Sequence, residues 1–78
     1  MNKYTATFYS HYDALTFYNS ITKKGIKAKL TPVPRKVSAS CGTSVQFHAP
    51  SITPPQTHEI EAIYTESNNK YSKIWPND

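Results

Sequence analysis

The order of hydrophobic and polar residues predicts a strand at the start of the chain and a helix directly after it. Residues 3–10 alternate, which is typical of a strand with one buried face. Ser10 is expected to cap a helix, because Asp13 follows three residues later as in a capping box. Apolar residues then recur at helical spacing up to Gly25, which should end the helix in a left-handed conformation.

Two further strands are predicted over residues 26–31 and 43–49, where apolar and polar residues again alternate. Pro32 and Pro34 should end the first of these, because proline cannot donate to a sheet ladder. One sheet face is expected to pack against helices through Tyr4, Ala6, Phe8, Ile26, Ala28, Leu30, Val45 and Phe47. The opposite face is expected to be open and to show Thr5, Thr7, Tyr9, Lys27, Lys29, Gln46 and His48.

The last third of the chain predicts a second helix and a final strand. Thr53 is a suitable N-cap, with Pro54 at the first helical position and Gln56 completing the capping motif. The buried stripe of this helix would be Ile60, Ile63 and Tyr64, and residues 70–75 would form the last strand, ended by Pro76. The order β-α-β-β-α-β favours an α+β, ferredoxin-like fold: one antiparallel sheet with two helices on one face.

Length and cysteine content narrow the class of protein. With 78 residues, the chain is expected to form a single domain over residues 1–78. Its one cysteine cannot form an internal disulfide, and no apolar run approaches the length of a membrane span. We therefore expect a cytoplasmic protein that does not enter the membrane, and the sequence leaves its oligomeric state open.

The formal net charge of +4 is compatible with an anionic partner, but it is also ordinary for a soluble protein. RNA-binding sheets of this fold place aromatic residues on the open face to stack bases. Here Phe47, the aromatic residue of the third strand, is expected to point the other way. The sequence therefore argues against nucleic acid as a partner.

The segment Pro32–Gly42 holds the single cysteine, Cys41. A lone cysteine is by default a small buried hydrophobic residue, but the residues around this one are small and polar, as in an exposed loop. A glycine next to it allows a tight or left-handed turn, and nearby cations and hydroxyl groups could favour a thiolate. The residues expected to support the Cys41 thiolate are Arg35, Lys36, Ser38, Ser40 and Gly42. Arg35 could equally pair with a carboxylate, and the two serines could equally be turn-formers.

No metal or cofactor is expected. His11, His48 and His58 lack the spacing of a metal site, and there is no second thiol. A protease-type nucleophile would need a substrate cleft, for which so short a chain has little material. Whether the protein is an enzyme stays open at this point, but a single exposed thiolate suits a carrier of a sulfur or selenium atom better than a stand-alone enzyme.

The stretches "ATFYSHYDAL" and "KKGIKAKLTPVPRKVSASCG" resemble a family of small bacterial selenium/sulfur-carrier-like domains. The pattern that carries the resemblance maps onto Ser10, Ala14, Gly25, Ile26, Pro32, Pro34, Arg35, Ser38, Ser40, Cys41 and Gly42. The resemblance implies that Cys41 carries a persulfide or a selenosulfide, with sulfur- or selenium-donor and acceptor proteins as partners. It covers roughly the first sixty per cent of the chain.

An alternative function stays open beside this one. The protein could be a small binding or redox-regulatory module in which the cysteine is structural. Its positive rim would then meet an anionic partner through Lys27, Lys29, Arg35 and Lys36.

Overall fold

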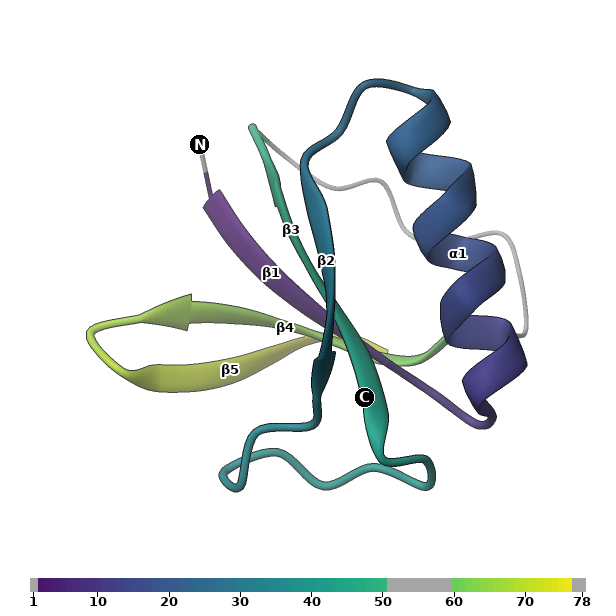
Figure 1. Ribbon diagram of the computed structural model, residues 1–78. Coiled ribbons are helices and arrows are strands. Elements are labelled where there is room, and N and C mark those ends of the chain that lie inside the picture. Colours follow the sequence, from purple (N-terminus) through teal and green to yellow (C-terminus); the bar gives the residue numbers. More distant parts are fainter. Residues whose placement is uncertain (1, 51–59, 77–78) are drawn as a thin grey trace.

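The computed structural model describes residues 2–50 and 60–76 as one helix and five strands (Figure 1). The helix packs against one face of a twisted antiparallel sheet. The elements are β1 (Asn2–Phe8), α1 (His11–Lys23), β2 (Ala28–Pro32), β3 (Thr43–Ala49), β4 (Ile60–Ser67) and β5 (Lys70–Trp75).

Helix α1 begins and ends as the sequence predicts. The Asp13 N–H donates to Ser10 Oγ at 3.2 Å, and Ser10 Oγ–H donates to the Asp13 carboxylate at 2.8 Å. At the other end Gly25 has a φ of 84°, a left-handed conformation that favours glycine. Gly25 N–H donates to Thr22 O and Ile26 N–H to Ile21 O, which is the hydrogen-bond pattern of a Schellman cap.

The strand order in the sheet is β2-β3-β1-β4-β5, with β1 in the centre. β1 pairs with β3 from Asn2↔Ala49 to Thr7↔Ser44, and β2 pairs with β3 from Ala28↔Phe47 to Pro32↔Thr43. This is the strand-helix-strand-strand arrangement that the sequence predicts for residues 2–49. All four pairings, including those of β4 with β1 and β5, are antiparallel.

The core lies between α1 and the sheet, and the predicted helix-facing residues form it. Tyr4, Ala6, Phe8, Val45 and Phe47 are buried in this core, with Ala14 and Ile21 from the helix. The remaining members of the predicted set are partly buried against the cluster: Ile26, Ala28 and Leu30. The expected inward orientation of Phe47 is confirmed, and its ring packs 5.3 Å from that of Tyr4.

The predicted second helix is wrong wherever the structure describes it, because residues 60–67 form strand β4. Its proposed start at residues 53–56 lies outside the described residues. Ile60 and Ile63 share a face at helical spacing for a different reason. Ile63 pairs with Ala6 and Ile60 with Phe8, so a β-bulge inserts one extra residue between them.

Strand β5 covers residues 70–75, as predicted, but it forms a hairpin with β4. The two-residue turn is Asn68–Asn69, with φ values of 52° and 65°. Positive φ at both positions is characteristic of a type I′ turn, which matches the twist of the strands it joins. The fold is therefore α+β with one helix and five strands, and the full ferredoxin-like prediction does not hold.

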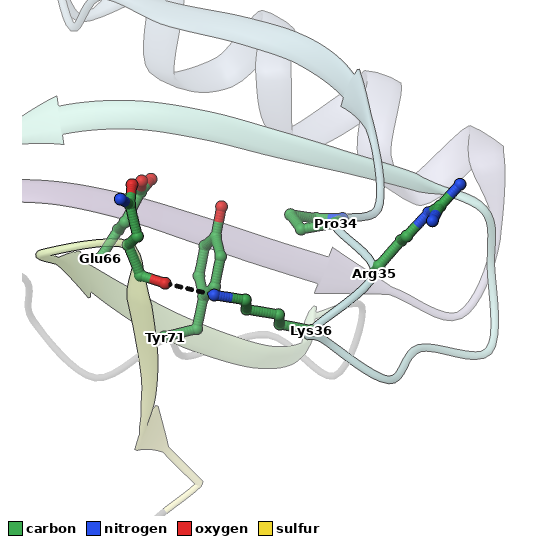
Figure 2. A pocket seen from close by; sticks show the side chains of 6 residues that line it. Pro34, Arg35, Lys36, Glu66 and Tyr71 are labelled. Carbon is green, nitrogen blue, oxygen red and sulfur yellow. Dashed lines mark hydrogen bonds between the residues drawn. The ribbon is translucent and has the colours of Figure 1, made fainter.

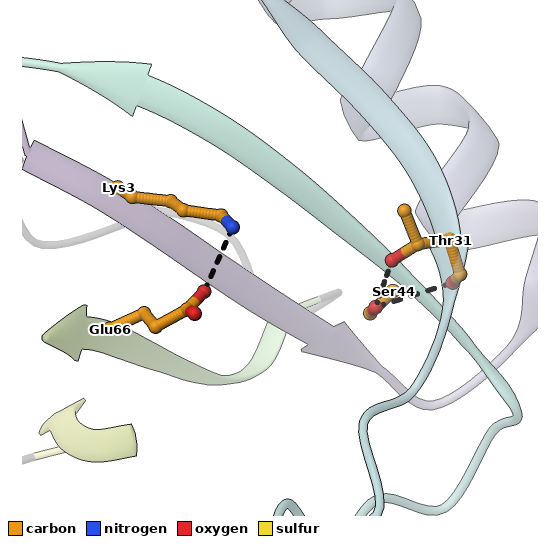
Figure 3. A network of polar contacts seen from close by, with 4 residues as sticks. All are labelled: Lys3, Thr31, Ser44 and Glu66. Carbon is orange, nitrogen blue, oxygen red and sulfur yellow. Dashed lines mark hydrogen bonds and ion pairs between the residues drawn. The ribbon is translucent and has the colours of Figure 1, made fainter. Parts of the chain in front are cut away.

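The face of the sheet opposite α1, here called the outer face, is less open than predicted. Tyr9, Lys27, Lys29 and His48 are exposed, but Thr5 and Thr7 are fully buried, as is their neighbour Ser44. Ser44 Oγ lies 3.0 Å from Thr31 Oγ1 on the adjacent strand (Figure 3). The loop of residues 33–42, here called the cysteine loop, crosses this face towards β4 and β5. The sequence predicts an exposed loop for this segment, so the cover that it gives to the outer face was not predicted.

Candidate functional site

The cysteine loop is folded back on itself and anchored by one apolar side chain. At its base the Val33 N–H donates to Gly42 O at 3.1 Å. A turn follows in which the Val37 N–H donates to Pro34 O at 3.0 Å, and the Val37 side chain is buried. The loop therefore has a fixed base and a buried anchor, although it contains neither helix nor strand.

Two polar contacts attach this loop to the β4–β5 hairpin. Lys36 Nζ donates to Asn69 O in the turn at 2.8 Å (Figure 2). Ser40 donates twice to the Glu61 carboxylate, from its N–H at 3.0 Å and from its hydroxyl at 2.7 Å. Glu61 is the extra residue of the β-bulge, and bulges commonly redirect a side chain in this way. The bulge thus supplies the carboxylate that holds the loop one residue before Cys41.

Cys41 lies at the end of the loop, is partly exposed as a residue and has a free thiol. The Thr43 N–H donates to Cys41 Sγ at 3.4 Å. Thr43 Oγ1 in turn lies 3.0 Å from His11 Nδ1 at the start of α1. Cys41 is therefore neither a fully buried nor a fully exposed residue, and one backbone N–H is directed at its sulfur.

The five predicted support residues lie in different places around the loop. Lys36 and Ser40 contact the hairpin, as described above. The exposed Arg35 side chain points away from Lys36 and Tyr71 (Figure 2). Ser38 is exposed and caps no helical turn, and within residues 2–50 and 60–76 we find no hydrogen bond that it makes. Gly42 does not adopt the left-handed conformation, and a Cβ there would meet nothing within 4 Å.

A pocket of about 400 Å³ separates the loop from the hairpin. It is lined by Pro34, Arg35, Lys36, Glu66, Asn69 and Tyr71 (Figure 2). Glu66 Oε1 is buried and lies 3.0 Å from Lys3 Nζ, at ion-pair distance but without hydrogen-bond geometry (Figure 3). Cys41 is not part of the lining of this pocket.

Sequence reasoning missed three residues that position the thiol: His11, Thr43 and Glu61. Glu61 was assigned to a helix, so its carboxylate could not be placed beside the loop. The sequence predicts Thr43 as the first residue of a strand, which does not indicate that its N–H is directed at Cys41 Sγ. His11 is weighed from the sequence as a metal ligand and as the partner of a protease-type cysteine, but not as a contact of Thr43. Glu61 is placed by a β-bulge, and His11 contacts a residue 32 positions away in the sequence. Neither arrangement leaves a local pattern in the sequence.

The described residues contain no group of three or more His, Cys, Asp or Glu side chains arranged to hold a metal ion. Among those same residues, no helix is both long and apolar enough to cross a membrane.

Residues 3–76 match the family model described as "Putative Se/S carrier protein-like". The chain belongs to this family. The match extends through β4 and β5, so the C-terminal part that carried no recognisable motif is also part of the family's domain. No curated protein and no solved structure matches the chain.

Proposed function

We propose that this member of the Se/S-carrier-like family carries a sulfur or selenium atom on Cys41, as a persulfide or a selenosulfide. The observation that supports this most is the setting of the sulfur. Cys41 is partly exposed, and the Thr43 N–H is directed at its sulfur. A donor in this position can stabilise the Cys41 thiolate before it attacks, and again when Cys41 is the leaving group on delivery.

The proposed transfer needs no external oxidant or reductant. Cys41 first loses its proton to solvent. Its thiolate then attacks the terminal sulfur of a persulfide on a donor protein, which forms a new S–S bond. The S–S bond of the donor breaks, and the donor cysteine leaves as a thiolate that takes up a proton. Delivery repeats the exchange in the other direction, when a nucleophile on an acceptor removes the terminal atom and Cys41 returns to its thiolate.

The fold suits a carrier because the thiol stands at a surface and not in a closed cleft. The pocket next to the loop is open and is lined by residues other than Cys41. A protein that only carries the atom has to present it to two partners in turn, and an exposed loop on a fixed base allows this. We therefore propose sulfur- or selenium-donor and acceptor proteins as the partners.

The experiment is to incubate the purified protein with a cysteine desulfurase and cysteine and then to measure its intact mass. We expect a gain of one sulfur atom that is reversed by a reducing thiol. The Cys41→Ala variant should gain nothing, since the chain has no other cysteine. A Ser38→Ala variant is the matched control, because this exposed side chain lies in the same loop and should leave the gain unchanged. No added mass on the wild type, or the same added mass on Cys41→Ala, would refute the proposal.

A further inference from the structure

Strand β2 forms one edge of the sheet, so the backbone groups on one of its two sides point away from β3. His48 N–H donates to Lys27 O at 3.2 Å, which fixes the alternation of the ladder. Lys29 and Thr31 therefore direct their backbone groups towards β3, whereas Ala28 and Leu30 direct theirs away from the sheet. Among the described residues, no strand pairs with that side of β2.

The outer-face side chains along this edge are positive. Lys27 and Lys29 are exposed, and with Ala28, Gln46 and His48 they line a hollow of about 210 Å³. From residue 14 to residue 58 the sequence contains six cations and no Asp or Glu: Lys23, Lys24, Lys27, Lys29, Arg35 and Lys36. Within the residues that the structure describes, none of these six forms an ion pair with a carboxylate. Within residues 2–50 and 60–76, the cations of this edge therefore have no carboxylate partner, and they lie beside a shallow hollow.

The side chains on the helix side of the same edge are apolar. Ala28 and Leu30 are only partly buried, and they pack against the core under α1. A strand added next to β2 would place alternate side chains on the two faces of the sheet. One set would lie beside Lys27 and Lys29, and the other beside Leu30. The complementary strand is therefore one that alternates acidic and apolar residues.

We propose that the edge of β2 binds an extended segment of a partner protein in which acidic and apolar residues alternate, as an added strand of the sheet. Backbone pairing to Ala28 and Leu30 would provide affinity, and the two lysines would select the acidic face. β2 ends at Pro32, where the cysteine loop begins, so a bound partner would lie next to the thiol-bearing segment. The binding itself does not depend on Cys41 and can be tested whether or not the carrier function holds.

Other occupants fit this edge less well. A second copy would bring Lys27 and Lys29 against the same lysines, and like charges on neighbouring strands repel. A nucleic acid could use the charge but not the backbone groups of Ala28 and Leu30, and this part of the outer face lacks the stacking aromatics of RNA-binding sheets. The opposite edge, β5, also has lysines, but it pairs with β4, which contains Glu61 and Glu66.

The experiment titrates the ¹⁵N-labelled protein with an acetylated and amidated peptide, Gly-Val-Glu-Val-Glu-Val-Gly. We expect the largest amide shifts at Ala28 and Leu30, and smaller ones at Lys27 and Lys29, whose backbone groups already face β3. Lys29→Glu should lower the affinity for the peptide by about tenfold, because a favourable cross-strand charge pair becomes a repulsive one. Lys70→Glu makes the same charge change on an exposed residue of the opposite edge strand, and it should change the affinity less than about twofold.

Three results would overturn the proposal. The first is a wild-type titration without shifts at Ala28 and Leu30, which would leave the lysines as a guard against aggregation at a sheet edge. The second is equal affinity for a peptide that is N-methylated at its valines, since methylation removes the donors needed for strand pairing. The third is tighter binding of a single-stranded RNA oligonucleotide with a steep salt dependence, which would assign the edge to nucleic acid.

Discussion

The carboxylate of Glu61 should set how firmly the cysteine loop is held. Glu61→Ala removes the hydrogen bonds from the Ser40 N–H, at 3.0 Å, and from the Ser40 hydroxyl, at 2.7 Å. Hydrogen bonds to charged groups contribute about 1.5–3 kcal/mol when buried, but Ser40 is exposed and Glu61 is only half-buried. We therefore take about 0.5–1 kcal/mol for each bond, and expect the variant to lose about 1–2 kcal/mol of unfolding free energy.

Two measurements test this magnitude. Thermal unfolding should show a Tm lower by about 4–8 °C per kcal/mol for a domain of this size. Amide hydrogen exchange at Ser40 should become roughly 5–30 times faster, because its acceptor is gone. Ser40→Ala should cost about half as much, because it keeps the backbone bond. The double variant should show a coupling energy of about 0.5–1 kcal/mol, the value of the hydroxyl bond.

The matched control is Glu66→Ala, the same change on the same strand at a carboxylate that pairs with Lys3 and, within the described residues, makes no hydrogen bond to the cysteine loop. Its Ser40 amide should exchange as in the wild type. An unchanged Ser40 exchange rate in Glu61→Ala, or an equal acceleration in Glu66→Ala, would show that the Glu61 carboxylate does not hold the loop.

Three further predictions follow from single backbone positions. Thr43→Pro removes the N–H that faces Cys41 and should slow persulfide formation by about tenfold. Thr43→Val keeps this N–H and should leave the rate unchanged. A folded proline variant with the wild-type rate would contradict the role of this donor. Gly25→Ala should lower the unfolding free energy by about 1–2 kcal/mol, while Gly42→Ala should change it by less than about 0.5 kcal/mol; equal losses in denaturant titrations would contradict the difference in backbone conformation. Asn69→Ala should cost about 1 kcal/mol and Asn69→Gly almost nothing, as measured by Tm; the reverse order would exclude a type I′ turn.

The first part of the fold could be predicted from sequence because its signals are local. Ser10 and Gly25 mark the two ends of α1 within a few residues of chain, and strict alternation marks β1 and β3. The same reasoning failed at β4 because a β-bulge interrupts the two-residue alternation of this strand. Ile60 and Ile63 are three residues apart on one face of a strand, which is the spacing that normally indicates a helix.

The candidate site was predicted only as far as its loop. Composition alone indicated that Cys41 lies in a surface segment, and its partial exposure agrees with that. The contacts that position the loop come from residues far away in the sequence, such as Glu61 and Asn69, and no spacing rule connects them to Cys41. The sequence predicts that Lys36 supports the Cys41 thiolate, but the Lys36 ammonium group donates to the hairpin turn instead.

The central place of β1 has a consequence for how the protein is made. β1 lies within the first residues of the chain, yet it pairs on one side with β3 and on the other with β4, where Tyr4 meets Thr65. During synthesis β1 cannot pair on both sides until β3 and β4 have left the ribosome. Until then it presents an unpaired hydrophobic strand, of the kind that chaperones bind and that aggregates when left unprotected. We expect the yield of folded protein to depend on what shields residues 2–8 during that interval.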